Sequence, residues 1–294
     1  MRAKSKQWFY NYDLGMPYQD VKLQVTGKDV YDNATRENPA YDREDYRWIS
    51  VGIDWGHQHS VIIGGMRNDG QIEIIRMFQI KEVEATDARN IGADLQALQV
   101  ALVKYDPDII VADIGDSGDR VARLINIYSD KQIYGCQYKS DPTSGLAKSS
   151  NQIIPTWNDN QHTVTVDKLM QNKRFIGLMK EHDIGFYHKK DEELQKYVSH
   201  WMNVVIRDDE QNNGEMRQVI TRKGPDHYSQ ASILCLLGFD KIRADYYQAG
   251  SYGFDFTSVN PEPTDIVQQI NSGDLFKGNK IDTDNLFGKP MPRG

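Results

Sequence analysis

Three short apolar segments near residue 50, separated by tight turns, constrain the fold of this chain more than any other feature. The segments are rich in β-branched residues and span about 48–54, 60–67 and 71–79. A glycine-flanked connection follows the first segment, and Asn68-Asp69-Gly70 supplies a hairpin turn between the last two. We therefore expect three antiparallel strands that open a sheet.

Helical and strand-like segments alternate after these three strands. Between residues 91 and 102, Ile and Leu recur at intervals of three and four, which predicts an amphipathic helix. The segments expected after 71–79 are a helix at 87–104, a strand at 109–113, a helix around Val121, a strand at 132–138, a long loop at 139–162, a helix at 165–180, a strand at 184–187, a helix at 192–203, a hairpin at 203–221 and a helix at 226–239. The order predicts an α/β fold.

Composition divides the chain into three parts. Residues 1–45 show no sustained periodicity, and we interpret them as a linker or lead-in segment. Residues 46–245 hold the predicted elements and form the main domain. Residues 246–294 are rich in Gly, Pro, Asp and Asn, which predicts a flexible C-terminal tail. The two cysteines, Cys136 and Cys235, have no metal-ligand spacing and are expected to be buried free thiols.

Three aspartates stand where the chain is expected to leave a strand or enter a helix. Asp54 ends the first strand, Asp113 ends the strand at 109–113, and Asp226 follows a Gly-Pro pair at the start of the last helix. Carboxylates at the ends of neighbouring strands, with one more from a helix facing the sheet, converge although they are distant in sequence. Such a cluster repels itself without cations, so divalent metal is its natural occupant.

The charge of the chain limits how it meets nucleic acid. Its formal net charge is -7 and its pI is near 5.5, whereas sequence-independent nucleic-acid binders usually carry a positive field. The bulk charge argues against tight DNA binding by this chain alone, although a partner in a larger assembly would remove that objection. Among the basic groups, Arg217, Arg222 and Lys223 lead directly into Asp226, and they are the candidate DNA contacts.

Short motifs carry a family resemblance. They are G-I-D-W-G at 52–56, V-A-D at 111–113 and P-D-H-Y at 225–228, followed by Ala231. In this order they resemble the nuclease domain of the large terminase subunit of tailed bacteriophages, and residues 9–18 resemble the connection between the ATPase and nuclease domains of that family. The resemblance implies a ribonuclease H-like mixed sheet, three antiparallel strands then parallel strands, with helices on both faces.

The same resemblance implies a metal-dependent endonuclease that cuts concatemeric double-stranded viral DNA during genome packaging. It implies two Mg²⁺ or Mn²⁺ ions, one activating water and one stabilising the leaving 3′ oxygen. Asp54 would bridge the ions, Asp113 and Asp226 would each serve one, and His227 or Asp116 would be additional ligands. The implied partners are double-stranded DNA, the ATPase domain of the packaging motor, the portal protein and the small terminase subunit, in the host cytoplasm and with no membrane.

One position departs from the family pattern. Many members have a second aspartate four residues into the last helix, where this chain has Gln230. Residues four apart share a helical face, so Asp226 would supply that carboxylate from one turn earlier. The simpler interpretation of Asp226 is a helix N-cap. No P-loop motif occurs, so we expect a C-terminal fragment or a split gene product.

Three other classes of protein are compatible with the same order of strands, helices and acidic residues. A Holliday-junction resolvase or transposase shares the catalytic fold. An actin-like or sugar-kinase-like ATPase also begins with I-D-x-G, and Asp113-Ile114-Gly115 imitates its second D-x-G. A catalytically inactive assembly module is the third alternative, and Gln230 is the residue that favours it.

Overall fold

The computed structural model describes residues 23–82, 92–115, 118–138, 154–188, 191–210 and 216–249. The lead-in residues 9–18, the tail beyond residue 250 and Asp116 lie outside these ranges. None of the helices in the described ranges has the length and apolar character that crossing a membrane requires.

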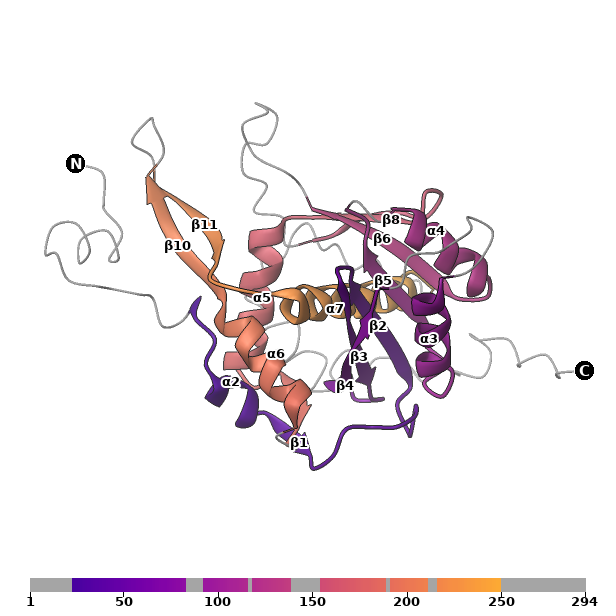
Figure 1. The fold of residues 1–294 in the computed structure, drawn as a ribbon, viewed down its shortest axis with the longest axis horizontal. Helices are drawn as coiled ribbons and strands as arrows, with labels where there is room; N and C mark the ends of the chain where they lie inside the picture. The colour runs from indigo at the N-terminus through magenta and orange to yellow at the C-terminus, as the bar shows by residue number, and fades with distance from the viewer. Residues whose placement is uncertain are drawn as a thin grey trace, which may run out of the picture.

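Nine strands of the described residues form one mixed sheet, which confirms the predicted fold class (Figure 1). Its antiparallel part pairs β2 with β3 and β3 with β4, and its parallel part pairs β2 with β5, β5 with β6 and β6 with β8. The spatial order is β1-β9-β4-β3-β2-β5-β6-β8-β7. The strands are β1 (Ala34–Arg36), β2 (Trp48–Asp54), β3 (Gln58–Met66), β4 (Ile72–Lys81), β5 (Ile109–Asp113), β6 (Gln132–Tyr138), β7 (Thr156–Asn158), β8 (Thr163–Val166) and β9 (Ile184–Tyr187). A separate hairpin joins β10 (Val204–Glu210) to β11 (Met216–Arg222).

Helices cover both faces of the sheet, as the resemblance implied. Helices α5 (Lys168–Lys180), α6 (Glu192–Met202) and α7 (His227–Ala249) share one hydrophobic core with the strands. Helices α3 (Ala93–Leu102) and α4 (Gly118–Ile127) pack on a second core, on the other face (Figure 1). Successive strand residues alternate between the two cores, because side chains of a strand point to opposite faces. In β2, for example, Ile49, Val51 and Ile53 belong to the α3/α4 side.

Helix α7 lies directly on β2, and a glycine makes this approach possible. A Cβ added to Gly52 would lie 1.9 Å from the carbonyl oxygen of Ala231 and 2.4 Å from the backbone nitrogen of Cys235. Ser50 Oγ donates a hydrogen bond to the Cys235 carbonyl at 2.7 Å. Every fourth residue of α7 therefore lies over every second residue of β2, with the two chains running in opposite directions. The spacing matches because four helical residues and two strand residues each advance by roughly 6 Å.

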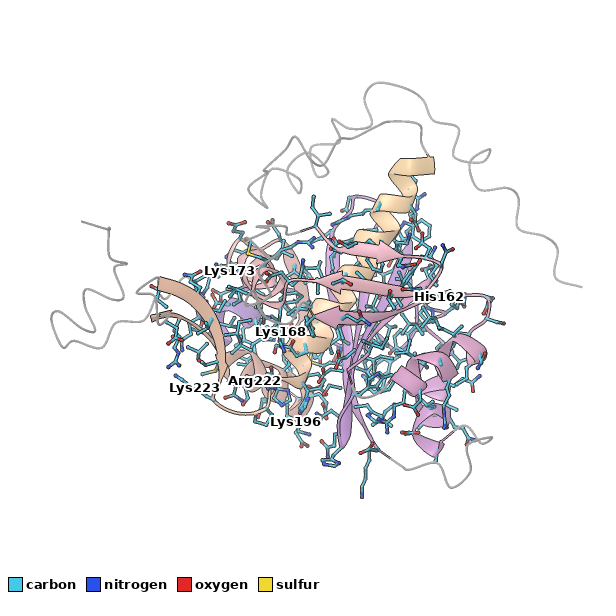
Figure 2. All side chains as sticks on the ribbon, turned by 90° about the horizontal axis from the view of Figure 1, so that it is seen from above. His162, Lys168, Lys173, Lys196, Arg222 and Lys223 are labelled. Carbon is cyan, nitrogen blue, oxygen red and sulfur yellow. The ribbon has the colours of Figure 1, made fainter. Side chains whose placement is uncertain are left out.

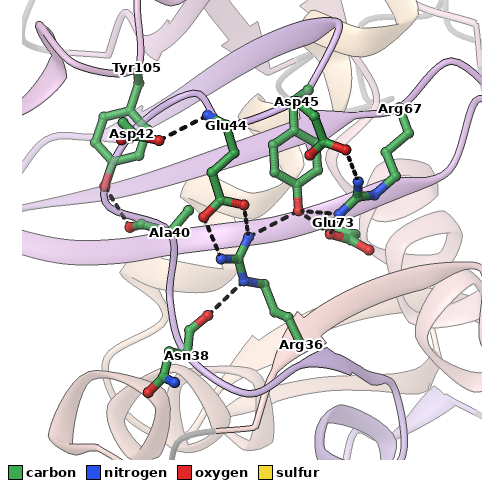
Figure 3. Close-up of polar contacts among 10 residues, drawn as sticks. Arg36, Asn38, Ala40, Asp42, Glu44, Asp45, Arg67, Glu73 and Tyr105 are labelled. Atoms are coloured by element: carbon green, nitrogen blue, oxygen red, sulfur yellow. Dashed lines mark hydrogen bonds and ion pairs between the residues drawn. The ribbon is translucent and has the colours of Figure 1, made fainter.

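Residues 23–45 pack against the sheet. Helix α2 (Gly27–Tyr31) begins with a capping box between Thr26 and Asp29, and β1 pairs in parallel with β9. A polar network then fastens the segment (Figure 3): the Arg36 guanidinium donates to both carboxylate oxygens of Glu44, at 3.0 and 2.7 Å, and the Tyr46 hydroxyl donates to the buried Glu73. The division of the chain at residue 46 stays a prediction.

Several predicted boundaries are wrong. The helix expected at 165–180 begins only at Lys168, because residues 163–166 form β8 beside β6. The loop expected at 139–162 contains the short strand β7. Helix α7 continues past Phe239, to Ala249. The predicted burial of both cysteines as free thiols is confirmed.

Candidate active site at the ends of β2, β5 and the start of α7

The alternation of strand side chains brings two of the predicted aspartates to one face. Asp54 follows Ser50 and Gly52 on the α7 side of β2, and Asp113 follows Ile109 and Val111, which belong to the α7-side core. Strands β2 and β5 are parallel, with Ile53 opposite Ala112, so Asp54 and Asp113 come at the next step of the same register. Both carboxylates therefore leave the same end of the sheet on the same face.

The third aspartate is carried there by α7. The four-residue steps that place Cys235 over Ser50 and Ala231 over Gly52 place His227 over Asp54. The Nδ1 atom of His227 donates a hydrogen bond to Asp54 Oδ2 at 2.7 Å. The residue before it, Asp226, is buried at 2 % exposure.

Side chains, not the helix backbone, hold the Asp226 carboxylate. Arg222 Nη1 donates to Asp226 Oδ1 at 3.2 Å, and Gln230 Nε2 donates to Asp226 Oδ2 at 3.1 Å. Its backbone carbonyl starts the helix, accepting from the N–H of Gln230 at 3.1 Å. Gln230 thus orients Asp226 from one helical turn away, and its own Oε1 is buried without a hydrogen-bond partner among the described residues.

Burial and neighbouring charges shift the pKa values of Asp54 and His227. Burial raises the pKa of Asp54, and the negative charge of Asp226 acts in the same direction, while His227 and Lys168 oppose them. The hydrogen bond to Asp54 raises the pKa of His227. Two carboxylates that repel each other in a buried place form an oxygen-donor set that a hard divalent cation would stabilise.

The Asp113 carboxylate lies close to the turn that follows β5. A Cβ on Gly115 would lie 2.9 Å from Asp113 Oδ2, so the Asp113 carboxylate is turned toward the residues that follow it. Within the described ranges no three His, Cys, Asp or Glu side chains are close enough to hold a metal ion as they stand. The donor chemistry of Asp54, Asp113 and Asp226 fits Mg²⁺ or Mn²⁺, because hard divalent cations prefer carboxylate oxygens.

A cleft with a volume of about 690 Å³ opens beside the aspartates. It is lined by the turn after β2 and by residues of β5, α4, α6 and α7, namely Trp55, Gly56, His57, Gln58, Gln79, Glu82, Asp113, Arg120, Lys196, His200, Pro225 and His227. Asp113 and His227 both line it, so a ligand in this cleft reaches the acidic site.

A buried network supports the turn that follows Asp54. His59 is 2 % exposed, and its Nε2 lies 3.0 Å from Asp94 Oδ2. Arg120 Nη2 donates to Glu82 Oε1 at 2.5 Å, and its guanidinium lies 5.8 Å from the centre of the Trp55 ring. His57, in contrast, is exposed.

Several basic side chains lie near the start of α7. Figure 2 shows Lys168, Lys196, Arg222 and Lys223 near the end of this helix that carries Asp226, with His162 on the other side of the helix. Arg222 and Lys223 are exposed. The side chain of Arg217 is not among those that the structure describes. These positions suit contacts to a nucleic-acid backbone, and their role as DNA contacts stays a prediction.

Other polar groups near α7 have structural roles. Arg174 forms a two-point ion pair with Asp240, at 2.5 and 2.6 Å, which accounts for its charge. His200 Nδ1 accepts the N–H of Tyr228 at 3.0 Å, at the first turn of α7. Burial and the neighbouring His227 lower the pKa of His200 to about 4, so its ring is neutral at pH 7.

Sequence reasoning missed one residue of this site, Tyr138 at the end of β6. The alternation Tyr134, Cys136, Tyr138 places its side chain on the α7 face, since the first two belong to the α7-side core. Asp113 is opposite Cys136 in the register. A strand that ends on a tyrosine beside the Asp113 strand was the signal available in the sequence.

No family model and no curated protein matches the sequence. Among solved structures, the chain is similar to the large terminase nuclease of thermophilic phage G20c with bound magnesium, at 13% identity over 72% of this chain and 96% of that one, with a TM-score of 0.41. It is also similar to the Thermus phage P74-26 large terminase nuclease domain, at 12% identity over 71% and 93%, with a TM-score of 0.42. A large terminase from a thermophilic bacteriophage in complex with ATP-gamma-S is similar at 13% identity and a TM-score of 0.43, with 79% of this chain covering 49% of that chain.

Proposed function

We propose that this chain is a metal-dependent endonuclease that cuts double-stranded viral DNA during genome packaging, by two-metal hydrolysis of a phosphodiester. One observation carries the proposal: Asp54 and Asp113 leave the same end and face of the sheet, and α7 places Asp226 and His227 over Asp54. An open cleft gives access to them. Paired divalent ions, when bound, would activate water and stabilise the leaving oxygen.

The residues of the site have distinct roles in this reaction. Asp54, Asp113 and Asp226 would hold the ions, and His227 and Gln230 orient two of these carboxylates by the hydrogen bonds described above. The oxygen of a water molecule attacks phosphorus while the bond from phosphorus to the 3′ oxygen breaks. The water loses a proton and the 3′ oxygen gains one, so the products are a 5′ phosphate and a 3′ hydroxyl.

Charge explains why the substrate would be held mainly by a partner. The chain has a net charge of -7, whereas exposed cations such as Arg222 and Lys223 form only a small positive area beside the start of α7. We therefore expect weak DNA affinity for the isolated chain that falls further as salt rises. The packaging ATPase, the portal and the small terminase subunit are the proposed partners, and a nuclease domain over residues 46–245 is the proposed functional unit.

A plasmid-nicking assay with Mn²⁺ tests the proposal. The natural chain should nick supercoiled plasmid, and Asp54→Asn should reduce the rate by about 100-fold or more without lowering the melting temperature. Asp119→Asn is a matched control, because Asp119 is an exposed aspartate in the first turn of α4. Nicking by Asp54→Asn at the natural rate would refute the proposal, and so would an equal loss in Asp119→Asn.

Gln230 favours one alternative, a catalytically inactive assembly module. It replaces an acid of the family pattern, and no three ligand side chains of the described residues are close enough to hold a metal ion as they stand. Calorimetric titration separates the two functions: an assembly module binds no Mn²⁺ at millimolar concentration, whereas the nuclease binds it and loses it in Asp54→Asn.

A further inference from the structure

The hydroxyl group of Tyr138 is buried and lacks a partner. Its Oη atom forms no hydrogen bond with any of the residues that the structure describes. A buried hydroxyl without a partner is costly, and polar atoms of this kind often mark the place of a ligand. Tyr138 is two residues beyond Cys136, on the same face and toward the same end of the sheet as Asp113.

The surroundings of this hydroxyl keep it protonated. Burial first, and then Coulombic interaction with Cys136 and with all three aspartates of the site, hold the pKa of Tyr138 well above its usual range. The carboxylates are thus near enough to act on the phenol, yet none of them accepts a hydrogen bond from it. The hydroxyl is therefore an unused donor that adjoins the acidic site.

Lys168 lies beside the Tyr138 ring. Lys168 Nζ, on the first residue of α5, lies 4.8 Å from the centre of the Tyr138 ring. Its charge also lowers the pKa of Asp54, so it adjoins the acidic site as well. No carboxylate among the described residues forms an ion pair with it, whereas Arg222 is paired with Asp226. Figure 2 shows Lys168 near the start of α7.

We propose that Tyr138 Oη and Lys168 Nζ form a two-donor site for a non-bridging oxygen of the phosphodiester in DNA that is bound at the aspartates. This inference rests on the proposed function and adds the residues that hold the substrate phosphate. A phosphate oxygen only accepts hydrogen bonds, and the site offers one neutral donor and one cationic donor. A metal ion is a poor occupant of the same place, because the ammonium repels it. A nucleobase would need the face of the ring, which the ammonium occupies.

Two conservative variants with matched controls test the site. Tyr138→Phe removes one oxygen, and Tyr128→Phe is its control, because the Tyr128 hydroxyl is also buried and without a partner among the described residues but its pKa responds to burial alone. Lys168→Met removes the ammonium, and Lys173→Met is its control on the same helix. We expect each test variant to lower single-turnover nicking in Mn²⁺ by about 10- to 100-fold, since a hydrogen bond to a charged group is lost.

Binding measurements separate a phosphate contact from a structural role. With Ca²⁺ in place of Mn²⁺, anisotropy of a short labelled duplex should show weaker binding for Tyr138→Phe and Lys168→Met than for their controls. Neither variant should bind Mn²⁺ more weakly than the natural chain in calorimetry, and Tyr138→Phe should not lower the melting temperature, because the hydroxyl has no partner among the described residues. Nicking and duplex binding equal to those of the controls would overturn the site, and so would a loss of Mn²⁺ affinity in Tyr138→Phe.

The result for the natural chain keeps the two proposals apart. If the natural chain and Asp54→Asn are equally inactive with Mn²⁺, the nuclease proposal fails and the phosphate site fails with it. If the natural chain nicks plasmid while Tyr138→Phe matches Tyr128→Phe, only the two-donor site is refuted.

Discussion

Gly52→Ala tests whether the contact of α7 with β2 builds the site. The added Cβ would lie 1.9 Å from the Ala231 carbonyl oxygen, and ordinary contact begins at 3.4 Å, so α7 must move by about 1.5 Å or the strand must bend. The obstacle is backbone, which cannot rotate away as a side chain would. Overpacking typically costs about 1–3 kcal/mol, and the Ser50 to Cys235 hydrogen bond would add about 1 kcal/mol. We expect a loss of about 3 kcal/mol in the free energy of unfolding.

The displacement should also reach the chemistry, because α7 carries both His227 and Asp226. A shift of about 1 Å at a catalytic group costs about 100-fold in rate, and we expect nicking in Mn²⁺ to fall at least that much. Urea unfolding followed by circular dichroism measures the stability change. Gly177→Ala is the control with the opposite sign: its Cβ would meet nothing within 4 Å inside α5, so stability should rise by about 0.5–1 kcal/mol. Natural stability in Gly52→Ala would refute the proposed packing.

Three further predictions concern the polar groups of the site. His227→Gln should weaken Mn²⁺ binding by about 10-fold or more in calorimetry, because it removes the ring that orients Asp54; equal affinity would show that the ring has no such role. His200→Asn should reduce the loss of stability between pH 6.5 and 4 by up to about 3 kcal/mol in urea unfolding, since the folded pKa is lowered to about 4 and the unfolded chain binds the extra proton; an unchanged pH profile would contradict this. Mn²⁺ at about 100 times its Kd should raise the unfolding free energy by about 2.7 kcal/mol, and EDTA or Asp54→Asn should remove the gain; a gain that persists in Asp54→Asn would place the metal elsewhere.

The sequence predicted the sheet end of the site well, for a physical reason. Strand side chains alternate with a period of two, so an acid at the end of a buried strand has a defined face once the strand is placed. The predicted bounds of β2, β5 and β6 agree with the structure. The positions of Asp54 and Asp113 on neighbouring parallel strands follow from that agreement, together with the order of the elements.

The helical end was less predictable, because it depends on which residue of α7 lies over which residue of β2. The sequence predicted Asp226 at the start of a helix, but only the contact at Gly52 fixes the position of that helix along β2. The bond between His227 and Asp54 and the support of Asp226 by Gln230 are consequences of this register. Likewise nothing local in the sequence shows that Asp94 lies beside His59.

Gln230 has a role that a comparison of single positions does not show. An acid at this position would lie one helical turn from Asp226, on the same face, and would add a third negative charge beside Asp54. The amide instead donates a hydrogen bond to the Asp226 carboxylate, so it lowers the local charge and fixes the direction of the remaining acid. A site with one acid fewer needs less cation charge to be stable, but it also holds the cation less tightly. The prediction that follows is specific: Gln230→Asp should tighten Mn²⁺ binding in calorimetry and lower the melting temperature without metal, whereas weaker Mn²⁺ binding would show that the amide is essential for placing Asp226.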